Sequence, residues 1–203
     1  PSASSAASDV YKRQIPDYLD NIDESNLAPV GDSGDVVQTS AGTTIVLGDT
    51  AFSSGNNEVG IDESDVGSAD ADWDYLGGLV DFKVSGGQAG ATYNVVIPLS
   101  GTVPAGAVLR KFMGDNIGWQ DFVENATNAI HSAMATSGTC PEPGSAAYAP
   151  GLPTADAMTP EQTICLELLI EDGGPNDMDG VANGTVVDPC LLYTSPSPRD
   201  GTS

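Results

Sequence analysis

Short apolar runs alternate with Gly-, Asn-, Asp- and Pro-rich clusters along most of the chain, and helical periodicity is nearly absent. Runs that concentrate Val, Ile, Tyr and Phe between such clusters are typical of all-β proteins. We expect strands near seven segments: Val36–Gln38, Thr43–Leu47, Leu79–Val84, Thr92–Leu99, Ala107–Phe112, Trp119–Val123 and Ile164–Ile170. This pattern predicts an all-β fold in which antiparallel sheets pack as a β-sandwich-like domain.

Two longer segments lack the strand pattern. Gly48–Asp74 is acidic and poor in apolar residues, so it is predicted to be a long loop or an edge hairpin. Gly138–Pro160 holds five prolines and shows little periodicity. Val123–Met134 and Thr159–Ile164 are the modest helix candidates. The predicted domain therefore has long acidic loops and at most one or two short helices.

Both ends of the chain resemble translated sequencing-adaptor DNA. Residues 4–14 read as an in-frame translation of a transposon-type adaptor, and Cys190–Ser195 reads as the reverse complement of the same DNA in another frame. Pro196–Asp200 matches the other adaptor arm. The alternative is a pair of disordered Ser- and Pro-rich tails. We predict that residues 1–14 and 190–203 are adaptor-derived and have no native structure, so that the biological sequence is an internal fragment.

The chain is strongly acidic, with six Lys and Arg against 29 Asp and Glu and a formal net charge of −23. Three of the cations and two of the acids fall in the adaptor-like ends, which leaves three cations and 27 acids in residues 15–189. Because like charges repel, this balance argues against binding to nucleic acid or to an anionic membrane. Acids in Gly-, Asn- and Ser-rich loops favour divalent cations and salty water. The sequence shows no signal peptide or membrane span.

The cysteines suggest one disulfide. Of the three, Cys190 belongs to the adaptor-like end, which leaves Cys140 and Cys165. A pair of cysteines in a chain rich in Asp, Gly and Thr and poor in Lys is typical of an oxidising compartment. Closing the loop between them would contribute on the order of 3 kcal/mol. The alternative is two buried free thiols.

The first candidate metal site lies in residues 15–26. Its run Ile-Pro-Asp-Tyr-Leu-Asp resembles the second half of a twelve-position calcium loop, in which alternate acids supply carboxylate oxygens. On this register Ile15 gives a backbone carbonyl at position 7, while Asp17 and Asp20 occupy positions 9 and 12. We predict the end of a truncated calcium-type repeat, and the alternative is a solvated acidic linker.

The second candidate calcium site lies between Asp172 and Asp188. Asp177, Asp179 and Asp188 fall at positions 1, 3 and 12 of the same kind of loop. A valine occupies position 5 and cannot ligate through its side chain, so this is not a standard EF-hand loop. Asn183 or Asp172 could complete a looser oxygen shell. The alternative is an Asx-rich turn whose side chains cap their own backbone.

Catalysis finds little support in the sequence. His131 is the single histidine, and no G-x-S-x-G or similar nucleophile motif accompanies it. Zinc is unsupported by any CxxC pair or histidine cluster, and no pair of carboxylates stands in a context typical of glycoside hydrolysis. Trp119, beside Phe122, is expected in the core. Trp73, in an acidic loop, is the better candidate for stacking on a sugar.

The order of several motifs carries a resemblance to a known family. In chain order they are Tyr93–Leu99, Val103–Phe112, Gly118–Val123, Ile130–Ala133, Gly138–Gly144, Tyr148–Leu152, Cys165–Gly180 and Ala182–Pro189. This order resembles the bacterial choice-of-anchor U domain of large exported proteins, especially from marine gammaproteobacteria. The resemblance covers about residues 27–189. Pro153–Thr163 departs from it, because this link before the second cysteine is longer than expected and could alter the disulfide loop.

The resemblance implies an extracellular, β-rich domain without catalytic activity that precedes one of several interchangeable C-terminal sorting signals. We therefore expect a calcium-stabilised structural or spacer domain at the surface of a Gram-negative bacterium. Its partner would be the cell envelope, through a sorting signal beyond Pro189, with no nucleic acid and no membrane span of its own. The alternative is a carbohydrate-binding or adhesive module that uses Trp73 to bind surface glycans.

Overall fold

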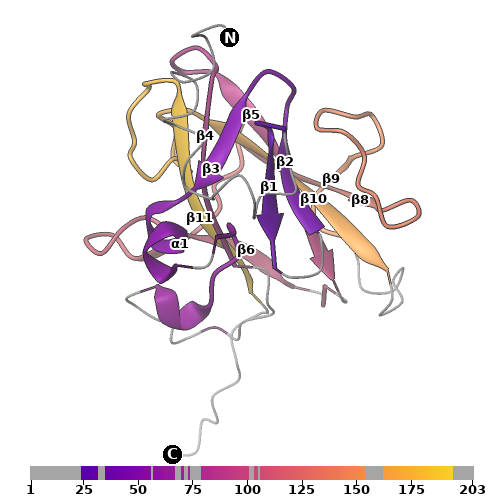
Figure 1. Cartoon of the computed structure of the whole chain (residues 1–203), viewed down its shortest axis with the longest axis horizontal. Helices are drawn as coiled ribbons and strands as arrows, with labels where there is room; N and C mark the ends of the chain where they lie inside the picture. Colours follow the sequence, from indigo (N-terminus) through magenta and orange to yellow (C-terminus); the bar gives the residue numbers. More distant parts are fainter. Residues whose placement is uncertain are drawn as a thin grey trace, which may run out of the picture.

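The chain folds as a β-sandwich of two antiparallel sheets, seen in a computed structural model (Figure 1). The structure describes residues 24–31, 35–55, 57–66, 70, 73, 79–100, 103–104, 106–153 and 162–193. The predicted all-β fold is thereby confirmed.

The first sheet has the strand order β1-β2-β5-β10-β8-β9. The bounds of these strands are, in that order, Leu27–Val30, Asp35–Thr39, Thr92–Ser100, Thr163–Glu171, Ala129–Met134 and Ala149–Pro150. The second sheet has the order β3-β4-β11-β6-β7. Its strands span Thr44–Leu47, Val80–Ser85, Thr185–Tyr193, Val108–Phe112 and Trp119–Asp121. A short helix, α1 (Asp49–Ser54), and a 3₁₀ turn, η1 (Glu63–Asp65), lie between β3 and β4.

The hydrophobic core lies between the two sheets. Successive side chains of a strand point to opposite faces, so every second residue of β5 and β10 is directed inward. The inward residues of these central strands are Tyr93, Val95, Ile97, Leu99, Ile164, Leu166, Leu168 and Ile170, all of them buried. From the second sheet, Phe82, Val84 and Val186 join the same core. Trp119 and Phe122 are also buried, as expected.

All seven predicted strands are present within a few residues of their expected positions. The helix predicted over Val123–Met134 is wrong, because its second half is β8, which pairs with β10 from Ala129 to Met134. Pairing with a buried central strand outweighs local helix preference. The other helix candidate, Thr159–Ile164, lies partly outside the described residues, and its last two residues begin β10.

Strand β11 was not expected from the sequence. It contains Pro189, which argues against a central strand because proline lacks an N–H donor. The register shows how the sheet accommodates it: Pro189 lies opposite Asp81 of β4, while pairing with β6 starts only at Cys190. Cys190–Tyr193, at the end of the chain that is predicted to be adaptor-derived, form the last part of β11 in this structure. These four residues form the whole β11–β6 register, and such pairing uses backbone groups that most residues provide.

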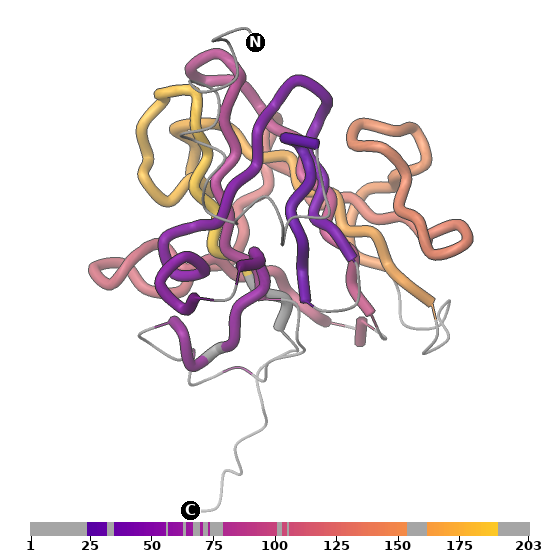
Figure 2. The backbone as a smooth tube through the Cα atoms, in the orientation of Figure 1, coloured from indigo at the N-terminus to yellow at the C-terminus, as the bar shows by residue number. Residues whose placement is uncertain are grey.

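Long connections emerge from both sheets. The predicted acidic loop Gly48–Asp74 contains α1 and η1. The connection between β8 and β9 stands out from the body of the sandwich (Figure 2). In the part of the chain that the structure describes, helices are too short to span a lipid bilayer.

Candidate functional site

Asp172 begins the connection between β10 and β11 and is a buried hydrogen-bond acceptor. Its Oδ2 accepts hydrogen bonds from the backbone amides of Gly90 and Gly184, both at 2.7 Å, and its Oδ1 accepts one from Asn183 at 3.2 Å. Burial acts to raise the pKa of Asp172, but these hydrogen bonds to its ionised form outweigh burial and lower it. Asp172 thus ties the connection to the turn before β5.

Asp177 holds the other side of the same connection. Its Oδ2 accepts a hydrogen bond from the Gly173 amide at 2.8 Å, and its Oδ1 accepts one from the Val187 amide at 2.9 Å. Burial raises the pKa of this carboxyl, and the negative charges of Asp179 and Asp172 raise it further. The two hydrogen bonds lower the pKa but do not cancel the rise. The two buried aspartates therefore accept hydrogen bonds from the same connection, but the pKa of Asp172 is lowered and that of Asp177 is raised.

Asp179 and Asn183 lie at the exposed tip of the connection. Asp179 Oδ1 accepts a hydrogen bond from the Val181 amide at 2.8 Å, and its Oδ2 accepts one from Asn183 Nδ2 at 2.9 Å. Asn183 Oδ1 in turn accepts a hydrogen bond from the Thr185 amide at 2.8 Å. The structure thus brings Asp172, Asp177, Asp179 and Asn183 into one loop.

All seven side-chain oxygens of these four residues accept a hydrogen bond within the fold. The arrangement is the self-capping Asx-rich turn that the sequence left open as an alternative. Oxygen donors match the chemistry of calcium, and each oxygen has a second lone pair. However, the described residues contain no group of three or more His, Cys, Asp or Glu side chains arranged to hold a metal ion.

Asp188 is not part of this loop. It lies on β11 with its carboxylate 2.6 Å from Lys111 Nζ, and both side chains are fully buried. Its side chain points to the face of the sheet opposite that of Val187, so the backbone contact between Asp177 and Val187 does not bring it to the loop. The structure thus does not bring Asp188 to position 12 of a loop begun by Asp177. Asp17 and Asp20 lie outside the described residues.

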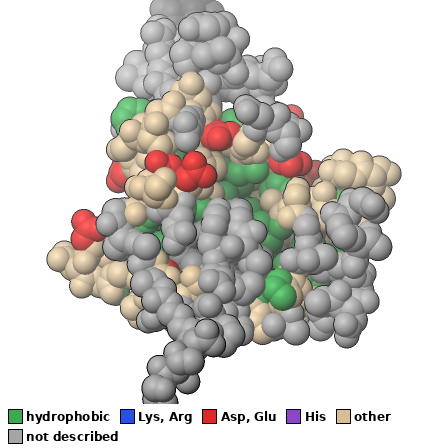
Figure 3. Space-filling model, turned by 90° about the horizontal axis from the view of Figure 1, so that it is seen from below, with side chains coloured by type: hydrophobic (Ala, Val, Ile, Leu, Met, Phe, Trp, Pro, Cys, Tyr) green, Lys and Arg blue, Asp and Glu red, His purple; other side chains and the backbone are tan. Residues whose placement is uncertain are grey.

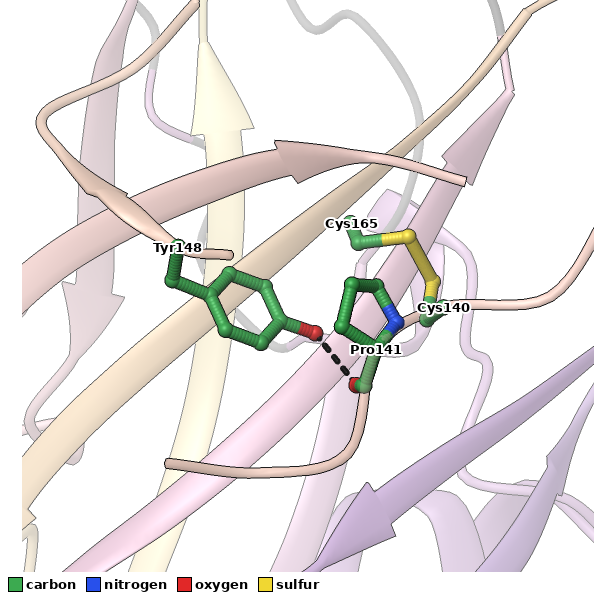
Figure 4. Close-up of a disulfide and its surroundings, with 4 residues drawn as sticks. All are labelled: Cys140, Pro141, Tyr148 and Cys165. Atoms are coloured by element: carbon green, nitrogen blue, oxygen red, sulfur yellow. Dashed lines mark hydrogen bonds between the residues drawn. A yellow bond between two sulfur atoms is a disulfide. The ribbon is translucent and has the colours of Figure 1, made fainter. Parts of the chain in front are cut away.

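Cys140 and Cys165 form a disulfide (Figure 4). Cys165 lies on the outer face of β10, and the bond fastens the β8–β9 connection to that face. Beside it, the hydroxyl of Tyr148 donates a hydrogen bond to the Pro141 carbonyl at 2.7 Å. Cys165, Tyr148 and Val96 form a second buried cluster outside the main core. The longer link before Cys165 does not prevent the pairing.

Glu167, two residues after Cys165 on the same outer face, is a buried carboxylate that the sequence analysis missed. Its Oε1 accepts hydrogen bonds from Asn94 Nδ2, at 3.1 Å, and from the Gly144 amide. Its Oε2 lies 3.3 Å from Nδ1 of His131, which is directly opposite in the register. A glutamate inside an apolar strand was the signal that could have found it, since a buried acid needs such partners.

Trp73 is half-buried and packs against the main core. The guanidinium of Arg110 lies over its ring, 5.0 Å from the centroid. Arg110 also pairs with Asp70 and Asp121 and donates a hydrogen bond to the Trp119 carbonyl at 3.2 Å. One face of the ring is therefore occupied by a cation–π contact, which leaves less of Trp73 for stacking on a sugar.

Acidic side chains are visible at several places on the lower face of the molecule (Figure 3). Comparisons of the chain with protein-family models, with curated proteins and with solved structures gave no match. The resemblance to the choice-of-anchor U domain thus stays a prediction that rests on the motifs in the sequence.

Proposed function

We propose that this protein is a non-catalytic structural spacer of an exported bacterial surface protein. In this proposal the domain precedes a C-terminal anchoring signal and holds it away from the domains upstream. The motif resemblance to the choice-of-anchor U domain motivates the proposal, and the internal architecture supports it.

The carrying observation is that the buried acids of the described chain bond to other parts of the fold. Asp81 binds helix amides, Glu167 binds the disulfide-bonded connection, Asp172 and Asp177 bind the β10–β11 connection, and Asp188 pairs with Lys111. The bonds of Asp81, Glu167 and Asp188 join segments that are distant in the sequence, as does the bond from Gly90 to Asp172. Asp177 bonds within its own connection. Buried carboxylates with satisfied hydrogen bonds rigidify a fold, which suits a domain that transmits force or position. Asp81, Glu167, Asp172 and Asp177 each accept such bonds from backbone amides.

The path of the chain also suits a spacer. The first strand, β1, starts near the top of the sandwich, and the last strand, β11, ends near the bottom (Figure 1). A domain entered at one end and left at the other extends a stalk along its own length. Such a domain needs only rigidity for this role.

We further propose that calcium stabilises the Asp172–Asn183 connection at the oxygen-rich tip. Thermal unfolding with and without millimolar calcium tests this, using Asp177→Ala and Asp179→Ala. The melting temperature should rise in calcium, and both changes should diminish the rise. Asp115→Ala, an exposed acid in the β6–β7 turn, is the matched control and should keep it. If the melting temperature of the unaltered protein is the same with and without calcium, this part of the proposal is rejected.

A glycan array with and without calcium tests the spacer role itself. Failure to bind any glycan at the highest protein concentration agrees with a spacer. Specific binding that Trp73→Ala abolishes would overturn it in favour of the carbohydrate-binding alternative.

A further inference from the structure

Lys111 and Asp188 form a charged pair inside the sandwich rather than on its surface. Lys111 lies opposite Cys190 in the β6–β11 register, and Asp188 lies opposite Phe82 in the β4–β11 register. Because Asp188 and Cys190 are two residues apart on one strand, both side chains of the pair share the inward face of the second sheet. Nζ and Oδ1 are 2.6 Å apart, with exposed fractions of 1% and 0% for the two side chains.

Two buried groups act on this pair: the thiol of Cys190, on the same face of β11, interacts with the Asp188 carboxyl, and Asp81 adds a like charge. Among the described residues, no hydrogen bond of ordinary geometry reaches Lys111 Nζ or either Asp188 carboxylate oxygen. The Phe122 ring lies 5.7 Å from Nζ, and Phe82 faces Asp188 across the strands. An amine and a carboxyl group are thus in contact inside the sandwich, closed off from the surface.

A buried ion pair of this kind is costly, since desolvation of two charges is repaid only where further hydrogen bonds complete it. Burial raises the pKa of Asp188, against the attraction of Lys111, and so favours the uncharged acid. Lys83 and Asp49 approach to the same 2.6 Å but are 30% and 78% exposed, so water supports their charges. The two pairs differ in surroundings rather than in distance.

We propose that Lys111 and Asp188 condense into an intramolecular isopeptide bond that joins β6 to β11. The contact distance and the complete burial are what such a condensation requires, because they hold the two reacting groups together and shield them from water.

The reaction balances without an outside reagent. Transfer of a proton from the ammonium to the carboxylate gives a neutral amine and a carboxylic acid. The lone pair of Nζ attacks Cγ of Asp188 and forms a C–N bond. The tetrahedral intermediate expels its hydroxyl group, which takes a proton from the nitrogen and leaves as water. The product is a neutral amide, which removes both buried charges.

The bond would fix the last described strand of the sandwich. The register between β6 and β11 consists of residues 190–193 alone, whereas Lys111 and Asp188 are joined through their side chains. A covalent link would keep β11 in the sheet when the chain is pulled from its C-terminal side.

Intact mass spectrometry of the full chain, denatured and with its disulfide accounted for, tests the proposal. The expected mass is lower by one water molecule than the sequence requires. Chymotryptic digestion should give one branched peptide that contains both Lys111 and Asp188. Lys111→Arg keeps the positive charge but lacks the nucleophilic amine, so it should restore the full mass. Lys83→Arg is the matched control and should keep the deficit.

A wild-type mass that agrees with the sequence and one disulfide overturns the proposal, whether or not the Lys111→Arg variant folds. So does a missing water that maps to a succinimide at Asp172 or Asp179, each of which precedes a glycine. The Asp188→Asn variant gives a further check, because condensation would then expel ammonia. Its final mass should equal that of the cross-linked wild type.

Discussion

The carboxylate of Asp81, on β4, accepts a hydrogen bond from the backbone amide of Ala51 at 3.0 Å, and another from Thr50 at 2.7 Å. These amides belong to the first turn of α1, whose N-cap residue Gly48 provides no side-chain cap. A Cβ on Gly48 would lie 1.9 Å from Asp81 Oδ1. The side chain of Asp81, on strand β4, therefore caps α1, and the absence of a Cβ at Gly48 leaves space for that carboxylate.

Asp81→Ala should lower the free energy of unfolding by about 1–2 kcal/mol, because α1 loses its cap. Urea denaturation measures the change. Asp62→Ala, an exposed acid of the same connection, should cost about 0.5 kcal/mol or less. Equal losses for the two variants would show that the cap contributes nothing.

Asp172→Ala should cost about 3 kcal/mol, because three backbone amides lose a buried acceptor. The measurement is made in the presence of a chelator, so that calcium plays no part. Asp179→Ala, at the exposed tip, should cost about 0.5 kcal/mol under the same conditions. A larger effect at Asp179 than at Asp172 would contradict the structural role assigned to the buried aspartate.

The contribution of Asp172 should depend on pH in a defined direction. Because its pKa in the folded protein lies below the ordinary value of 3.8, its stabilisation is fully present above pH 3.8 and is lost as the pH falls through the folded pKa. The pKa of Asp177 is raised in the folded protein, so the pH dependence of its contribution to stability runs in the opposite direction. That contribution is present below pH 3.8 and is lost as the pH rises through the folded pKa. Urea unfolding of wild type, Asp172→Ala and Asp177→Ala from about pH 3 to 6 separates the two.

Reduction of the Cys140–Cys165 disulfide should lower the free energy of unfolding by about 3 kcal/mol, given a sequence separation of 25 residues. Thermal or urea unfolding with and without reductant measures it. A Cys190→Ala variant should respond to reductant as strongly as the wild type. If Cys140 and Cys165 can both be alkylated without reductant, in protein from an oxidising compartment, the disulfide is rejected.

Arg110→Lys should cost about 1–2 kcal/mol, because lysine cannot pair with Asp70 and Asp121 and cover the Trp73 ring at once. Tryptophan fluorescence should change in the folded state, since the cation over Trp73 is displaced. Lys83→Arg, on the surface, serves as the control and should be close to neutral. An unchanged spectrum and stability for Arg110→Lys would contradict the contact.

Much of the fold could be predicted from the chain alone. The runs that became β5 and β10 are long, apolar and rich in β-branched residues, and local pattern suffices for them. β8 was mistaken for a helix because its short segment, Ala129–Met134, has no decisive period of its own. β11 was missed because Pro189 argues against a strand and Asp188 was assigned to a calcium loop.

The candidate site was predicted only in part. Spacing grouped Asp172, Asp177, Asp179 and Asn183 correctly, because they share one short connection. It also assigned Asp188 to that group, although strand alternation turns this side chain into the core toward Lys111. Glu167 and Asp81 were missed, since their partners come from segments far away in the sequence.

The sequence by itself determined the strand-rich class, the acidic character, the candidate cysteine pair and the Asx-rich loop, because composition and local periodicity carry these properties. Only the tertiary structure decided what each acid does. Whether a carboxylate binds an amide, caps a helix or meets a buried lysine depends on which strands become neighbours and in what register. Register couples residues such as Lys111 and Asp188 across 77 positions, a relationship that a local pattern does not encode.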